Sequence, residues 1–190
     1  SVYIDSLLLL NDAIFETNDY TVHLLNPNQN GLSWTQGGYI STASIGGHFL
    51  RNMLPNSPYI FPVGNQDLSG KYRFVEITPF NSDTNTYGVA LLANSIDNVY
   101  GASISGAIGP FNSSATSENI EKLNNSYFYS IYSYTLSDSA KISFYFNSND
   151  EPQTYTSVAQ WKAPINNWEN KSFTISPLSN SLPNFGTPNR

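Results

Sequence analysis

The stretch "SPYIFPVGNQDLSGKYRFVEITP" (residues 57–79) decides the fold, because it ends one aromatic strand and soon begins another. Tyr59, Phe61 and Val63 recur at every second position, which is the period of a β-strand with one buried face. Pro62 has no backbone N–H to donate to a sheet, so it favours a strand end. The pattern predicts a corner directly after the first strand.

The second half of this stretch predicts a different kind of strand. Gly64 permits a backbone turn that a Cβ would obstruct, and residues 65–70 suit a polar loop. Between residues 72 and 77, large apolar side chains occupy both sides of the strand, as is typical of a strand covered on both faces. We therefore expect a central strand here, and interpret the whole stretch as an architectural hinge in a β-sandwich.

The rest of the chain shows the same strand period, interrupted by clusters of Asn, Asp, Ser and Pro that end strands. Further strands are expected within residues 7–10, 20–25, 38–42, 47–53, 87–91, 127–136, 142–146, 158–161 and 172–176. Residues 117–123 are the one short helix candidate. About ten or more short strands without a βαβ rhythm predict an all-β, antiparallel sandwich or jelly roll. We expect one domain over residues 1–176, followed by a proline-rich extension or linker at 177–190.

The composition limits the classes of function. The chain has no cysteine, which excludes disulfides and thiolate chemistry. Its net charge is −6 with eight scattered Lys and Arg, which argues against nucleic-acid binding, and no apolar run approaches the length of a membrane span. Only 12% of residues are charged while 14% are aromatic, so Asn, Ser and Thr must supply the polar surface. Such a surface favours an extracellular location.

Several collinear motifs point to one family. They are "GGYIS" (37–41), "GHFLR" (47–51), "YIFPVG" (59–64), "YRFVEI" (72–77), "YFYSI" (127–131), "FYFNSND" (144–150) and "QWKAPINNW" (160–168). Their order resembles β-rich modules of adhesin-like cell-surface proteins that Bacteroidetes export by the type IX secretion system. Phe49 and Phe74 stand where that pattern has Leu and Pro. The resemblance implies a cell-surface location, contact with the type IX export machinery during secretion, and a C-terminal targeting domain not seen in this sequence.

Residues for catalysis or metal binding are sparse. His23 and His48 alternate with apolar neighbours, so we expect both on the surface, and no Gly-x-Ser-x-Gly elbow is present. No catalytic residue and no cofactor are expected. Calcium is the ion that the loops suit best, since "NSDTN" (81–85) and "NSNDE" (147–151) place Asp83 and Asp150 among other oxygen ligands. Neither loop has the spacing of an EF-hand.

The aromatic surplus allows two interpretations. Trp34, Tyr132 and Tyr134 would form a stacking platform for glycans, as on many β-sandwich binding modules. Alternatively, the aromatic residues are structural, with Trp161 and Trp168 paired across a hairpin and with Tyr127, Tyr129 and Ile131 facing the core. The structural interpretation is favoured for most of them, and Tyr132 and Tyr134, on the other face of their strand, remain the better ligand candidates.

Two Asp-Ser-aliphatic tripeptides place Ser6 and Ser139 in the pattern that these bacteria O-glycosylate on exported proteins. Taken together, the sequence predicts a non-catalytic extracellular module for adhesion or for a surface filament. Residues 7–10, "LLLL", would be a strand that is donated to, or completed by, a neighbouring subunit. A carbohydrate-binding module that recognises surface glycans is the alternative, and a glycan-active enzyme ranks third.

Overall fold

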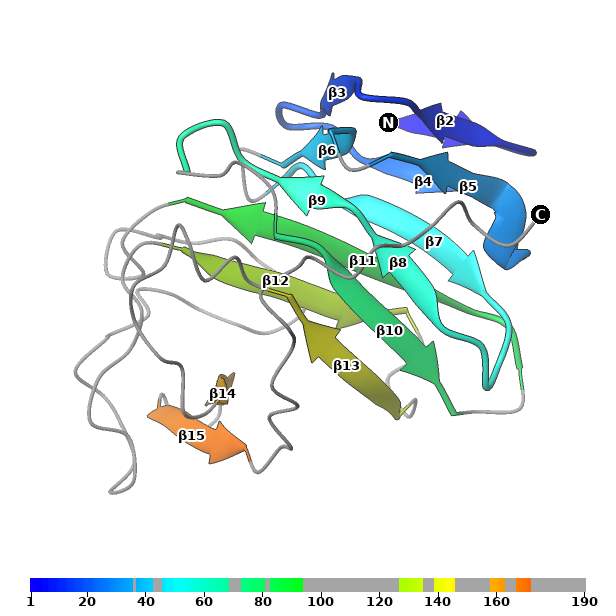
Figure 1. Cartoon of the computed structure of the whole chain (residues 1–190). Helices are drawn as coiled ribbons and strands as arrows, with labels where there is room; N and C mark the ends of the chain where they lie inside the picture. The colour runs from blue at the N-terminus through cyan, green and yellow to red at the C-terminus, as the bar shows by residue number, and fades with distance from the viewer. Residues whose placement is uncertain are drawn as a thin grey trace.

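A computed structural model describes residues 1–35, 37–42, 46–68, 73–80, 83–93, 127–134 and 139–145, and the backbone of 158–162 and 167–171. These parts form the strands β1 to β15 and one 3₁₀ turn, η1 (Gln29–Gly31) (Figure 1). The all-β class and the short strands are therefore confirmed. The helix candidate at 117–123 and the extension at 177–190 lie outside the described residues.

The N-terminal third winds as three stacked coils of three strands each. The first coil is β1 (Val2–Ile4), β2 (Leu8–Leu10) and β3 (Ile14–Glu16); the second is β4 (Val22–Leu24), β5 (Leu32–Trp34) and β6 (Tyr39–Ser41); the third is β7 (Phe49–Met53), β8 (Tyr59–Phe61) and β9 (Val63–Gly64). Corresponding strands pair in parallel: β1 with β4 and β4 with β7, β2 with β5, β3 with β6 and β6 with β9. Two neighbouring parallel strands must be joined by a long connection, and here one full coil of the chain forms that connection.

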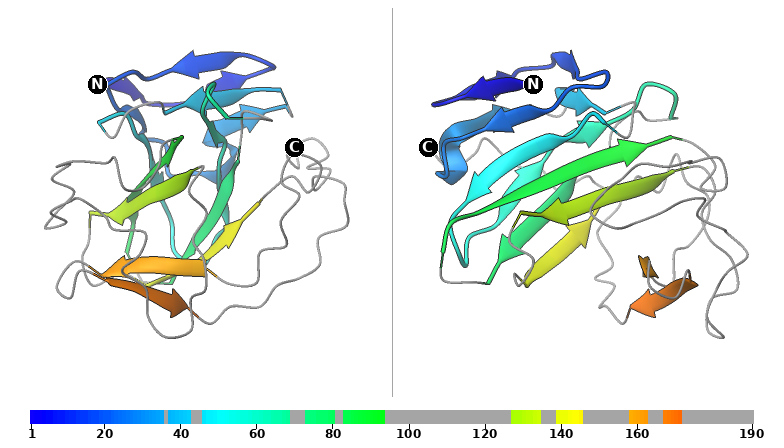
Figure 2. Two further views of the ribbon diagram at one scale, coloured as in Figure 1. Left: turned by 90° about the vertical axis from the view of Figure 1, so that its left-hand side faces the viewer. Right: turned by 180° about the vertical axis from the view of Figure 1, so that it is seen from behind.

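The later strands add to the third coil in antiparallel fashion. β10 (Val75–Pro79) lies between β8 and β13 (Ala140–Phe144), and β11 (Asn85–Leu92) lies between β7 and β12 (Phe128–Ser133). Figure 2 shows these two sheets facing each other when the molecule is seen end-on. β10 is the middle strand of its sheet, as predicted, but Glu76 and Thr78 on its second face are only half-buried, so the expectation that both faces are covered is not met in full. The sheets are mixed, however, so the expectation of wholly antiparallel pairing is wrong for the coils.

The segment from β8 through Pro62 to β9 forms the corner between two sheets. β8 pairs with β10, whereas β9 pairs with β6, and Pro62 is the single residue between β8 and β9. The Pro62 carbonyl accepts a hydrogen bond from the Ile40 amide at 2.7 Å, so the corner is fixed to the second coil. The hinge interpretation is therefore confirmed, but Gly64 belongs to a strand and not to a turn.

The core lies between the two sheets and extends upward into the coils. Phe49 and Phe61 meet edge to face across it, with ring centroids 5.6 Å apart. The other buried apolar residues of this cluster are Leu8, Leu10, Val22, Leu24, Leu32, Ile40, Met53, Tyr59, Val63, Val75, Ile77, Tyr87, Val89 and Leu91. Each such side chain contributes about 1.5–3 kcal/mol by leaving water. Tyr129 and Ile131 pack against this cluster as predicted, and so does Tyr127.

The hairpin of β14 (Val158–Lys162) and β15 (Asn167–Lys171) is described by its backbone alone. The two strands are antiparallel, and Trp161 lies directly opposite Trp168 in their register. The predicted pairing of these two positions across a hairpin is confirmed.

Candidate functional site

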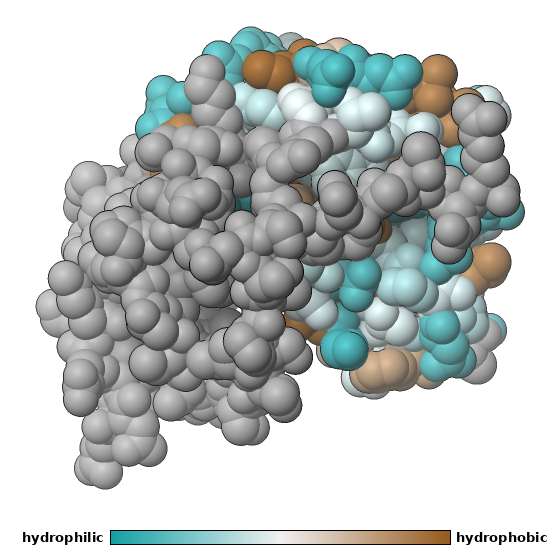
Figure 3. All heavy atoms as spheres, viewed as in Figure 1, coloured by the Kyte–Doolittle hydropathy of each residue, from teal (hydrophilic) through white to brown (hydrophobic). Residues whose placement is uncertain are grey.

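The first coil is an open end of the molecule. Among the described residues, β1, β2 and β3 each pair with a strand on one side only, so their other edges carry unpaired backbone groups. In the part of the chain that the structure describes, ten large hydrophobic residues are exposed. Six of them lie in this coil or in the loop that leads from it to β4 (residues 17–21): Val2, Tyr3, Leu7, Leu9, Ile14 and Tyr20. Figure 3 shows apolar side chains along this upper end, over β2 and β3. The open end therefore combines free strand edges with apolar surface.

The described side chains at this end carry only negative charge. No Lys or Arg precedes Arg51 in the sequence, whereas Asp5, Asp12, Glu16 and Asp19 all lie exposed in the first coil or in the loop that leads from it to β4. At the opposite end, β12 and β13 are the outer strands of the two sheets among the described residues, and Lys141 on β13 is exposed. Among the described residues, the first coil is thus acidic, whereas β13 carries Lys141, which interacts with the half-buried Glu76 of β10.

A row of side chains crosses the outer face of the five-stranded sheet β1-β4-β7-β11-β12. We name it the tyrosine row: Tyr3, His23, Asn52, Thr86 and Tyr134. The Tyr3 and His23 ring centroids are 5.7 Å apart, and His23 Nε2 lies 2.9 Å from Asn52 Oδ1. Thr86 Oγ1 donates to the same Asn52 oxygen at 2.7 Å, and the Tyr134 amide donates to the Thr86 carbonyl at 3.0 Å.

Strand alternation explains why these five residues share one face. Their neighbours Val22, Leu24, Met53 and Tyr87 belong to the core, so the residues between and beside them point outward. The two ends of the row are open, since Tyr3 and Tyr134 are 65% and 63% exposed. The three central residues are half-buried. The row is therefore a fixed polar strip with an exposed aromatic ring at each end.

Tyr132, two residues from Tyr134, is anchored beside the row. Its ring lies over Gly88, where a Cβ would come within 2.6 Å of Tyr132 Cζ. Its centroid is 5.8 Å from that of Tyr134 and 5.0 Å from the ring of His48. Burial, with smaller contributions from Tyr134, raises the pKa of Tyr132 to about 12, so its hydroxyl remains a donor at neutral pH. The structure thus brings Tyr132 and Tyr134 together, as the glycan hypothesis requires.

The prediction that His48 lies on the surface is wrong, because the residue is buried. It does alternate away from the core, but the Tyr132 ring packs against it on that outer face, with an angle of 70° between the two ring planes. Its Nε2 lies 3.0 Å from Ser130 Oγ, which is also buried. Burial lowers the pKa of His48 to about 4, so the imidazole is neutral at pH 7 and the pair acts as a hydrogen bond between strands.

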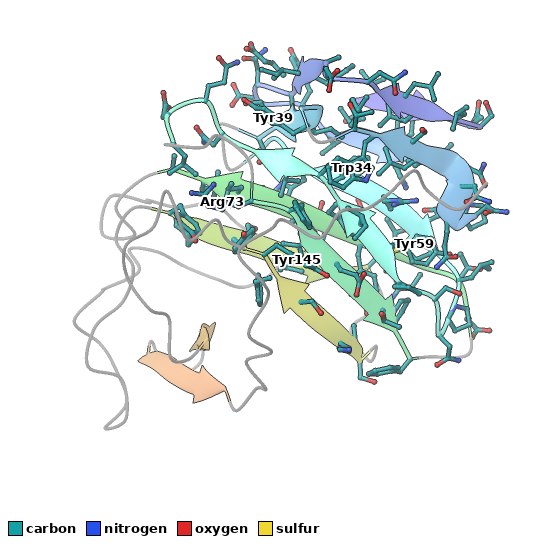
Figure 4. The ribbon with its side chains drawn as sticks, viewed as in Figure 1. Trp34, Tyr39, Tyr59, Arg73 and Tyr145 are labelled. Carbon is teal, nitrogen blue, oxygen red and sulfur yellow. The ribbon has the colours of Figure 1, made fainter. Side chains whose placement is uncertain are left out.

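Trp34 does not join Tyr132 and Tyr134. It shares a face of β5 with Leu32 and packs against the core, and its ring centroid is 5.4 Å from that of Phe74. Phe74 in turn stacks on Tyr145 at 4.4 Å. Figure 4 shows Trp34 and Tyr145 on the side of the molecule formed by β5, β10 and β13. The three predicted platform residues therefore do not lie together, and Trp34 belongs to an aromatic cluster with Phe74 and Tyr145.

The remaining candidates are single exposed positions. Asp83 is exposed, and the described residues contain no group of three or more His, Asp or Glu that would hold a metal ion. Asp150 lies outside the described residues. Ser6 and Ser139 are both exposed, and each uses its backbone carbonyl as an acceptor, from Asn26 Nδ2 and from the Phe80 amide respectively. Their hydroxyl groups are therefore accessible for modification.

No protein-family model, curated protein or solved structure matches this chain. Within the described residues, no helix is long and apolar enough to cross a membrane. The function must therefore be argued from the two surfaces above: the open first coil and the tyrosine row. Sequence reasoning missed Tyr3, Asn52 and Thr86, because their only signal was an outward position on strands whose order in the sheet was unknown.

Proposed function

We propose that this protein is a non-catalytic, extracellular surface module that joins other copies of itself at the open first coil, as a filament or adhesin-like subunit. The observation that carries the proposal is the unpaired outer edge of β1, β2 and β3 together with the apolar side chains around it. Natural sheets protect such edges by covering, charging or shortening them. A subunit that adds strands to these edges would satisfy the backbone groups and bury the apolar side chains.

Charge selects the orientation of the neighbouring subunit. Two first coils placed face to face would bring together two sets of four carboxylates, which repel each other. The opposite end presents the outer strands β12 and β13 and the Lys141 ammonium group. A head-to-tail contact would place β1 of one subunit beside β12 of the next and so continue the five-stranded sheet from subunit to subunit. Because such a contact is heterologous, repeating it produces an open chain of subunits.

The composition supports the location. A surface built from amide and hydroxyl groups, with 12% charged residues, suits an extracellular protein. The motif order that resembles type IX cargo supports export to the cell surface, where a filament or an adhesin acts.

Assembly can be tested by sedimentation velocity and negative-stain electron microscopy over a concentration series. We expect the wild-type protein to form linear oligomers as its concentration rises. Ile14→Lys places a charge at the open end and should leave a monomer, whereas Leu54→Lys is the matched control, since Ile14 and Leu54 are 44% and 43% exposed. Circular dichroism checks that both variants fold. A wild-type protein that stays monomeric, or equal assembly by both variants, would contradict the proposal.

A further inference from the structure

We propose that the tyrosine row is a binding site for a linear, uncharged polysaccharide that lies across the five strands. This inference rests on the outer face of the five-stranded sheet, whereas the proposed assembly rests on the strand edges of the first coil. Tyr3 on β1 belongs to both surfaces, so assembly and glycan binding are measured separately below. It makes the outer face of the sheet the adhesive surface of the molecule.

The ends of the row fit the flat, apolar faces of sugar rings. Tyr3 extends from β1 and Tyr134 follows β12, so they stand at opposite edges of the sheet. Neighbouring strands are about 4.8 Å apart, so the four intervals from β1 to β12 separate the two rings by about 19 Å, roughly the length of four sugar units. An extended chain of that length would stack on both tyrosines at once, and a shorter one would reach only one.

The middle of the row offers hydrogen-bonding groups that are already oriented. Asn52 Oδ1 accepts from Thr86 and faces His23 Nε2, while Asn52 Nδ2 donates to the Leu25 carbonyl at 3.0 Å. Because the Asn52 oxygen is an acceptor, His23 Nε2 is the donor, and in that tautomer of the ring Nδ1 is an acceptor. The second N–H of the Asn52 side-chain amide is also left to donate to a ligand. An acceptor and a donor side by side match hydroxyl groups, which both donate and accept.

The described strands of this face present no charged side chain, and this sets the class of ligand. The outward positions of β1, β4, β7, β11 and β12 contain no Asp, Glu, Lys or Arg. A polyanion would gain no ion pair here and would be repelled by a protein of net charge −6. An extended peptide would be expected at a free strand edge and not across the strands. A neutral chain of hydroxyl groups and apolar ring faces therefore fits the row best.

The test is affinity electrophoresis against linear neutral polysaccharides (β-1,4-glucan, β-1,3-glucan, xylan and mannan), with alginate as a polyanion. Calorimetry then uses oligosaccharides of two to six units from the polymer that binds. We expect affinity to rise up to about four units and then level off, as the spacing of the two rings requires. Tyr3→Ala and Tyr134→Ala should each weaken binding roughly tenfold, which is the upper range for the loss of one aromatic contact.

Tyr20→Ala is the matched control, because Tyr20 is 65% exposed, like Tyr3, but lies outside the row. It should bind like the wild type. The measurement is repeated on Ile14→Lys, so that a failure of assembly and a failure of glycan binding are seen separately. No binding to any of the neutral polymers overturns the inference. Binding that Tyr3→Ala and Tyr134→Ala leave unchanged, or that Tyr20→Ala weakens equally, also overturns it.

Discussion

The Arg51 guanidinium carbon lies 5.0 Å from the centre of the Tyr59 ring, deep between the two sheets. Arg51 is 1% exposed, and its guanidinium donates to the Ile60 carbonyl at 2.8 Å and to the Gln29 carbonyl at 3.2 Å. Tyr59 in turn donates to the Pro27 carbonyl and accepts from the Leu54 amide. One cation and one phenol therefore connect η1, the second coil and the strands β7 and β8.

Replacing Arg51 should destabilise the fold. Arg51→Ala leaves the two carbonyls without their donor and opens a cavity under Tyr59, so we expect a loss of at least about 2 kcal/mol in the free energy of unfolding. Arg51→Lys keeps the charge, but lysine has no planar guanidinium group to bond both carbonyls. Its free energy of unfolding should therefore lie between those of the wild type and Arg51→Ala. Urea denaturation measures all three proteins. Equal stability of Arg51→Ala and the wild type would show that this contact is unimportant.

The buried His48 predicts a pH dependence of stability. Its pKa is lowered by burial to about 4, against an ordinary value of 6.5, so between these two pH values the unfolded chain binds more protons than the folded one. Stability therefore rises with pH through this window, is fully present above about pH 6.5, and is lost as the pH falls toward 4. The contribution of this group is about 3 kcal/mol.

A variant separates this effect from the titration of carboxylates. His48→Gln retains a group that can bond Ser130 but does not titrate, so its unfolding free energy should vary less between pH 7 and 4 than that of the wild type. The comparison uses urea denaturation at several pH values. Parallel pH profiles of the two proteins would rule out His48 as the source.

Gly38 should be essential for the stacking of the first coil on the second. A Cβ at this position would lie 1.7 Å from the Leu10 carbonyl oxygen, which is backbone and cannot move without displacing β2. We expect Gly38→Ala to cost about 3 kcal/mol and to increase hydrogen exchange in β1, β2 and β3. Gly46→Ala is the control, since its nearest contact would be 3.2 Å. Similar exchange in both variants would refute this role.

Gly88 and Tyr132 should be energetically coupled. Gly88→Ala forces the Tyr132 ring away from His48, so we expect a loss of about 1–3 kcal/mol. In a background of Tyr132→Ala the three nearest contacts of the new methyl group are absent, so the same substitution should cost much less. A double-mutant cycle by urea denaturation measures the difference. Additive effects would mean that the ring does not rest on Gly88.

Local sequence patterns predicted the positions of the strands well but not which strands pair with each other. The alternation in residues 57–79 was enough to predict a corner and a central strand, since both depend on side chains within a few positions of each other. Parallel stacking of coils was missed because the strands that pair are 20 residues apart at Val2 and Val22 but 27 apart at Val22 and Phe49. Unequal coils leave no fixed period, and a strand has the same apolar alternation in either direction.

The site was predictable only where one strand carries it. Tyr132 and Tyr134 were assigned to the outer face from their spacing alone, and they do lie together. Trp34 was not separable from them, because the sequence does not show which sheet β5 joins. Asn52 and Thr86 are brought together because β7 pairs directly with β11, and no local sequence pattern predicts that pairing.

The stacked coils also bear on the order in which the chain gains its structure. Parallel contacts within the coils join Val2 to Val22 and Leu8 to Leu32, whereas closing the sandwich requires Ile77 to meet Ile142. Shorter loops lose less entropy on closure, so we expect the coils to form first and the sheet β8-β10-β13 to be completed last. A chain that enters a compartment N-terminus first would then fold progressively from its leading end, while its final strands are still in transit.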